Sequence, residues 1–192
     1  MSPQLYLASR SPRRSQLLAQ LKLRFTVLPA DIAESPQPGQ GADAYVRAMA
    51  LGKAQAARRN LHDDLPVLGA DTEVVVDGEV LGKPADRARG IAMLRRLSGR
   101  AHDVFSAVSV LQDDRVETEV SVTRVEFGEI SAQQAEAYWA SGEPADKAGG
   151  YAIQGLGAIF VRRIDGSYSG VMGLPLYETA RLLDRFGVRP IA

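Results

Sequence analysis

The chain has 192 residues, of which 45% are apolar and 24% are charged, and this composition predicts a soluble globular protein rather than a disordered one. Its 23 basic and 23 acidic residues give a formal net charge of zero, so no overall field draws it to nucleic acid or to a membrane surface. The sequence contains no cysteine, which excludes disulfides, thiolate catalysis and zinc–thiolate sites and suits a reducing cytosol.

The beginning of the chain gives no sign of export. It lacks the charged start and apolar core of a signal peptide, and no apolar run approaches the roughly 18 residues of a membrane span. The two histidines, His62 and His102, are too few and too far apart to suggest a metal cluster. We therefore expect a cytoplasmic protein with neither a membrane nor a nucleic acid as its partner.

Helix and strand patterns alternate along the chain without repeats and without a linker that would separate two domains. The expected helices are 11–21, 43 to about 60 with Asp43 as its cap, 86–98, 131–141 and one that Pro175 begins. The expected strands are 5–7, 25–29, the arms of a hairpin in 65–84 that turns at Asp77-Gly78, two long strands within 102–127, and one after the glycine-rich segment 146–161. This order predicts a single α/β domain over residues 1–192 with a mixed β-sheet and flanking helices.

The first predicted helix begins with an unusual concentration of positive charge. Arg13 and Arg14 lie in its first turn, where the macrodipole and the free N–H groups are already positive. Each such cation should cost roughly 0.3–1 kcal/mol on an exposed helix. A bound phosphate would remove this repulsion, because a helix N-terminus and guanidinium groups together form an anion clamp. The alternative is that both arginines are solvated surface side chains.

Further polar residues suggest what the anion belongs to. Lys53 falls on the apolar face of the second predicted helix, so it either extends to water or reaches over the core edge into a cleft. In the stretch GADTEVVV the strand period places Asp71 and Glu73 on one face and Thr72 on the other. The two carboxylates could share a divalent cation or form a polar outer face. Lys83 follows the hairpin as a second phosphate ligand or an ordinary turn lysine; together these residues suggest a metal-bound polyphosphate.

Six segments, taken in order, carry a family resemblance: ASRSPRR, GADT, GKP, HDVFSAV, DKAGGYAIQGLG and GSYSGVMGLPL. They resemble the Maf family of nucleoside triphosphate pyrophosphatases over nearly the whole chain. The resemblance implies an inosine triphosphatase-like fold, with two lobes around a cleft. It also implies hydrolysis of a nucleotide to its monophosphate and pyrophosphate with Mg²⁺ or Mn²⁺. The segment DKAGGYAIQG resembles the branch that acts on dTTP and UTP, whereas the branch that acts on 7-methyl-GTP departs here.

Position by position, the resemblance assigns Asp71 as the catalytic base and Gln154 as the residue that selects the substrate. It implies that Asp71 and Glu34 hold the metal. Glu73 stands where the family usually has an aliphatic residue, so its metal role has no support from the resemblance, and Ser106 stands where a threonine is more usual. The substrate-binding residues that we expect are Ser9, Ser11, Arg13, Arg14, Glu34, Lys53, Thr72, Lys83 and Gln154.

Other functions would use some of the same chemistry. The sequence has no GxxxxGK[ST] loop, which argues against a P-loop NTPase, and its glycine-rich segment has no Rossmann context. A nucleotidyltransferase would use the same phosphate and metal groups but join the nucleotide to an acceptor. A nucleotide-binding regulator of cell division would bind without turnover. Within the family, 7-methyl-GTP or another modified nucleotide is the alternative substrate, and a homodimer is a possible assembly.

Overall fold

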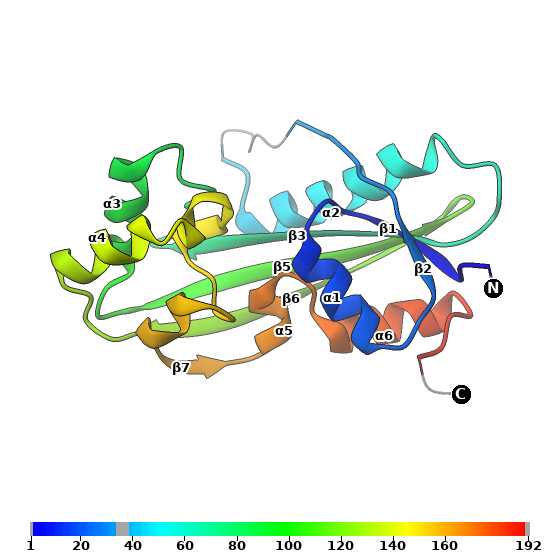
Figure 1. Ribbon diagram of the computed structural model, residues 1–192. Coiled ribbons are helices and arrows are strands. Elements are labelled where there is room, and N and C mark those ends of the chain that lie inside the picture. Colours follow the sequence, from blue (N-terminus) through cyan, green and yellow to red (C-terminus); the bar gives the residue numbers. More distant parts are fainter. Residues whose placement is uncertain (1, 34–38, 191–192) are drawn as a thin grey trace.

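The computed structural model describes residues 2–33 and 39–190 (Figure 1). The strands are β1 (Leu5–Ala8), β2 (Phe25–Val27), β3 (Val67–Val76), β4 (Glu79–Val80), β5 (Ala101–Gln112), β6 (Arg115–Phe127) and β7 (Val161–Asp165). The α-helices are α1 (Pro12–Gln20), α2 (Ala42–Arg58), α3 (Arg87–Leu97), α4 (Ala132–Ala140), α5 (Tyr168–Met172) and α6 (Leu176–Arg185). Three short 3₁₀ helices are η1 (Glu143–Asp146), η2 (Ala148–Gly150) and η3 (Leu156–Phe160).

The described strands form one mixed sheet in the order β2-β1-β3-β5-β6-β7, with β4 paired to β3, which confirms the predicted fold class. Strands β1, β2 and β3 run parallel, and β3, β5, β6 and β7 pair antiparallel. On one side of β3, β1 pairs only as far as Gly69, and β4 begins to pair at Val75. Within the described residues, positions 70–74 therefore have no neighbouring strand on that side.

Helices cover the two faces of the sheet unequally. Helix α2 packs on one face, where Ala54 and Ala57 contact Val67 of β3 and Leu111 of β5 in a buried cluster. The opposite face carries two separate groups of helices, α1 with α6 toward one end of the sheet and α3 with α4 toward the other (Figure 1). Strand β3 runs under both groups. On the face that they share, Leu68 packs in the core of the first group and Val74, further along the strand, packs in the core of the second. The two groups thus form two lobes on one continuous sheet.

Most predicted elements are present, with three corrections. Asp77 and Gly78 form the predicted hairpin turn and both have positive φ, 54° and 77°. The cap of α2 is Gly41 rather than Asp43, which lies in the first helical turn, where its negative charge still suits the macrodipole. Pro175 precedes α6 as its N-cap residue. Helix α5 was not predicted; Ser167 caps it by accepting a hydrogen bond from the N–H of Gly170.

No helix within residues 2–33 or 39–190 is both long enough and apolar enough to cross a membrane.

Candidate active site

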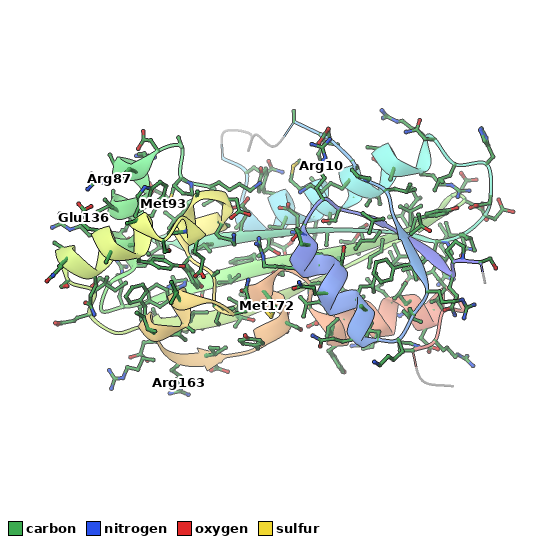
Figure 2. The ribbon with its side chains drawn as sticks, in the orientation of Figure 1. Arg10, Arg87, Met93, Glu136, Arg163 and Met172 are labelled. Atoms are coloured by element: carbon green, nitrogen blue, oxygen red, sulfur yellow. The ribbon has the colours of Figure 1, made fainter. Side chains whose placement is uncertain are left out.

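A cleft of about 500 Å³ lies between the lobes, beside the unpaired edge of β3. Its volume falls in the range of small-molecule sites. Its walls come from the turn between β1 and α1, the segment from η1 to Gln154, and the end of α5, where Met172 is labelled in Figure 2. The predicted site residues that line it are Ser9, Ser11, Arg13, Arg14, Lys53, Asp71, Thr72, Lys83 and Gln154. Glu34 lies outside the described residues.

The open edge of β3 explains how residues from both faces of one strand reach one cleft. Asp71 and Thr72 are neighbours in a strand, so their side chains point to opposite faces of the sheet. Both nevertheless line the cleft, because β1 ends beside Gly69 and leaves this edge uncovered. Glu73 lines the cleft as well. The sheet therefore presents a carboxylate and a hydroxyl to the same ligand.

Lys53 of α2 does not extend to water but pairs with Asp71. Its Nζ donates to Oδ1 of Asp71 over 2.7 Å, and the two side chains are only 9% and 7% exposed. Helical periodicity places Lys53 on the face of α2 that packs on the sheet, which brings the two groups together. The other oxygen of Asp71, Oδ2, is buried and has no hydrogen-bond partner among the described residues. A buried polar atom left unpaired costs roughly 1–3 kcal/mol, so Oδ2 is suited to a ligand.

This unpaired oxygen also fits the divalent cation that the family implies. Mg²⁺ in nucleotide sites is commonly held by one or two carboxylates together with substrate phosphates and water. Asp71 offers Oδ2 for such a cation while Lys53 occupies Oδ1. Asp71 is therefore the described residue that would hold the cation, and the predicted second ligand, Glu34, lies outside the described residues.

The two arginines at the start of α1 have different surroundings. Arg13 Nη1 lies 3.7 Å from Oδ2 of Asp146 on the other side of the cleft, and the Arg13 side chain is 24% exposed. Arg14 instead donates from Nε to the carbonyl oxygen of Gly173 over 2.8 Å and so ties α1 to the end of α5. Ser11 is the N-cap residue of α1, but its side chain makes no capping hydrogen bond. Its N–H donates to Oγ of the buried Ser9, 3.1 Å away, which fixes the turn below the arginines.

Thr72 belongs to a chain of hydroxyl groups whose direction can be assigned. Its Oγ1 lies 2.9 Å from Oγ of Ser106, and Ser106 donates to the carbonyl oxygen of Gly170 over 2.6 Å. A serine has a single hydroxyl proton and a carbonyl can only accept, so Thr72 must donate to Ser106. Thr72 therefore presents acceptor lone pairs, and not a proton, to the cleft.

Residues that line the cleft but were not predicted as site residues include Asp146, Lys147 and Tyr151. The Lys147 ammonium group contacts Asp146. Burial raises the pKa of Asp146, but Lys147 and Arg13 outweigh it and leave that pKa below its usual value. Tyr151 is buried, and its hydroxyl lies 2.9 Å from Nε2 of His102. The charged pair before the glycines in DKAGGY was the available signal for the first two.

Comparisons with known proteins identify the family of this chain. The family model described as Maf-like protein matches residues 4–186. The chain is 51% identical over 184 residues to a dTTP/UTP pyrophosphatase of Methylococcus capsulatus, across 96% of this chain and 91% of that protein. It is 50% identical over 190 residues to a dTTP/UTP pyrophosphatase of Saccharophagus degradans, across 97% and 90%. A solved nucleoside-triphosphatase / dITP/XTP pyrophosphatase from Mycobacterium abscessus gives a TM-score of 0.46 at 17% identity over 94% of each chain. From residue 4 to residue 186, this chain belongs to the Maf family.

Proposed function

We propose that this protein hydrolyses dTTP and UTP to the nucleoside monophosphate and pyrophosphate. The observation that carries the proposal is the buried Lys53–Asp71 pair, whose unpaired carboxylate oxygen shares a cleft with Arg13 and Lys83. This combination of one ionised acceptor and several cations suits attack of water on a triphosphate. Relatives that are about half identical to this chain carry the name dTTP/UTP pyrophosphatase, which supports the choice of substrates.

The cations would hold the triphosphate. Arg13 and the first N–H groups of α1 lie on one side of the cleft, and Lys83 contributes from the end of the β3–β4 hairpin. A phosphate bound here removes the repulsion between Arg13 and the helix dipole, so the charge that is unfavourable in the empty protein becomes useful in the complex.

Asp71 would orient the attacking water and accept its proton on one lone pair of Oδ2, whose second lone pair would remain for the cation. The Lys53 ammonium group fixes the carboxylate through Oδ1 and leaves Oδ2 directed to the ligand. A carboxylate is a weak base at neutral pH. A divalent cation bound at Asp71 would supply the missing driving force by lowering the pKa of water. General-base assistance itself contributes roughly 10²–10⁴-fold.

Gln154 would select the base. Its exposed side chain carries one amide acceptor and an amide donor, which match the ring N–H and a carbonyl oxygen of uracil or thymine. Cytosine offers an unprotonated ring nitrogen and an amino group at these positions. A site that leaves such polar groups unpaired can reject an analogue strongly.

One screen tests the function. Purified protein is assayed with dTTP, UTP, CTP and 7-methyl-GTP in Mg²⁺ or Mn²⁺, with and without nucleotide acceptors, and the products are identified. Pyrophosphate and monophosphate formed from dTTP and UTP without an acceptor support the proposal. A product joined to an acceptor would indicate a nucleotidyltransferase, preferred turnover of 7-methyl-GTP would indicate the other branch, and binding without turnover would indicate a regulator. The cytoplasmic location and the homodimer stay predictions.

A further inference from the structure

One carboxylate that does not line the cleft holds the loop that carries Gln154. Glu143 of η1 accepts the N–H of Leu156 at Oε2 over 3.0 Å, and it accepts the N–H of Gly157 at Oε1 over 3.0 Å. The hydroxyl of Tyr138 donates to the same Oε1 over 2.6 Å. All three donors approach one side chain, so the carboxylate fixes the chain just after Gln154.

Tyr138 extends this hold to the residues just before Gln154. Its hydroxyl oxygen accepts the N–H of Ala152 over 3.0 Å while its proton goes to Glu143. Burial, and then the neighbouring carboxylate, raises the pKa of Tyr138 well above its ordinary value, so the phenol keeps its proton at neutral pH. Gln154 therefore lies between two anchored positions, Ala152 and Leu156.

The charge of Glu143 is suited to this task. Burial pushes the pKa of Glu143 upward, but the Tyr138 hydroxyl and the N–H groups of Gly157 and Leu156 outweigh it and hold that pKa below its usual value. The carboxylate is consequently ionised at neutral pH, and hydrogen bonds to an ionised acceptor are about twice as strong as neutral ones.

Gly155 shows how closely the loop approaches the carboxylate. A Cβ atom at this position would lie 2.0 Å from Oε2 of Glu143. Real Cβ atoms do not come this close to another atom, so the Glu143 carboxylate would have to move away. A glycine at this position can let the backbone approach the nucleotide base. In the structure, the absence of a side chain at Gly155 also allows the Glu143 carboxylate to reach the N–H groups of Leu156 and Gly157.

We infer that Glu143 is a positioning residue for base selection, which sets the geometry of the Gln154 amide by fixing residues 152–157. The inference rests on the proposed role of Gln154. Glu143 does not itself line the cleft, so it acts through the loop and not on the substrate. Without the hydrogen bonds from Glu143 and Tyr138, the Gln154 amide would sample several orientations, and some of them would accept cytosine.

The test is the ratio of kcat/KM for UTP to that for CTP. Glu143→Gln keeps the size of the side chain but turns an NH₂ group toward a backbone N–H, and Tyr138→Phe removes the hydroxyl while keeping the ring. We expect the ratio to fall roughly tenfold in each variant, with kcat for UTP changing less than roughly threefold. A residue that served only stability would lower the melting temperature without moving this ratio.

Two further arms make the result specific. Glu136→Gln is the matched control, because Glu136 lies on α4 and pairs with Arg87 of α3 in the same lobe (Figure 2); its ratio should stay at the wild-type value. In a Gln154→Ala background, Glu143→Gln should cause little additional loss of selectivity, because both changes act on one interaction.

The outcomes separate this inference from the proposed function. If Gln154→Ala erodes the preference while the folded Glu143→Gln and Tyr138→Phe variants keep it, the positioning role is wrong and base selection by Gln154 stands. If Gln154→Ala also leaves the ratio unchanged, both ideas are wrong. Should Glu143→Gln not fold, Tyr138→Phe decides alone, because it retains the carboxylate.

Discussion

The ammonium group of Lys53 and the carboxylate of Asp71 form a buried ion pair that uses only one oxygen of the aspartate. Taking two charges out of water is expensive, and a buried pair of this kind is often no more stable than an apolar replacement. The Lys53–Asp71 pair matters for function because it leaves Oδ2 of Asp71 available to a ligand. Lys53 compensates the charge of Asp71 without occupying the atom that a water or a cation would use.

The two partners should therefore contribute differently to stability and to activity. Asp71→Asn should lower turnover by at least roughly 10²-fold and should also lower the free energy of unfolding, because it removes the anion from this buried ion pair. Adding Lys53→Met should recover part of the stability but none of the turnover. Urea unfolding and kcat at saturating metal measure both effects. Near-normal turnover of Asp71→Asn in a metal-replete assay would rule out Asp71 as the base.

Arg13→Ala should lower activity while leaving the stability of the apo protein nearly unchanged. The contact between Arg13 and the 69% exposed Asp146 spans 3.7 Å, and such exposed pairs are worth about 0–1 kcal/mol. The repulsion at the start of α1 costs a similar amount, so the apo protein should change by less than about 1 kcal/mol while kcat/KM falls strongly. Arg14→Ala is the comparison: it breaks the bond to Gly173 and should destabilise the apo protein by about 1 kcal/mol. A loss of more than about 2 kcal/mol for Arg13→Ala with unchanged kinetics would make Arg13 a structural residue.

Local chemistry made much of this fold predictable. The Asp77-Gly78 turn depends on residues that tolerate positive φ, and the position of Lys53 on α2 follows from helical periodicity alone. Helix α5 was missed because its sequence, rich in glycine and serine, resembles a loop. Its five residues are held by the Ser167 cap and by the bond from Ser106 to the carbonyl of Gly170.

The partners of the site residues were beyond the reach of local patterns. The bond between Arg14 and Gly173 joins residues 159 positions apart, and no periodicity encodes it. Glu143 was missed for another reason, since two of its three donors are backbone N–H groups, which carry no residue-specific signal. The motifs therefore located the cleft residues, but only the packed structure shows which of them support one another.

Ser106 should matter through the direction of its hydrogen bonds. Ser106→Ala removes the acceptor of the Thr72 proton and one donor of the Gly170 carbonyl, which also accepts the N–H of Gly173, so we expect a roughly tenfold lower kcat/KM and a loss of about 1 kcal/mol in stability. Ser106→Thr keeps the hydroxyl and should retain kcat/KM, although the added methyl group enters a buried site and should cost some stability. Steady-state kinetics with dTTP check this. Equal kinetics for the alanine and threonine variants would show that the hydroxyl chain does not position Thr72.

His102 should make the protein sensitive to acid. It is buried against Phe127 and Tyr151, and this burial lowers the pKa of its imidazole from 6.5 to about 4. As the pH falls below 6.5, the His102 imidazole becomes protonated in the unfolded chain, but in the folded protein it stays neutral until about pH 4. Stability is therefore lost as the pH falls through this window, by up to about 3 kcal/mol, at 1.36 kcal/mol for each unit of pKa.

Urea unfolding of wild type and His102→Gln at pH 7.5 and pH 4.5 isolates this contribution, because the carboxylates titrate alike in both proteins. At pH 7.5 we expect the variant to be less stable than wild type, since it loses the ring contact between His102 and Tyr151. On acidification, its free energy of unfolding should fall by roughly 2–3 kcal/mol less than that of wild type. His62→Gln, which changes an exposed histidine, should keep the wild-type acid dependence. Parallel stability losses for wild type and His102→Gln between the two pH values would mean that the folded protein accepts the His102 proton as readily as the unfolded chain does.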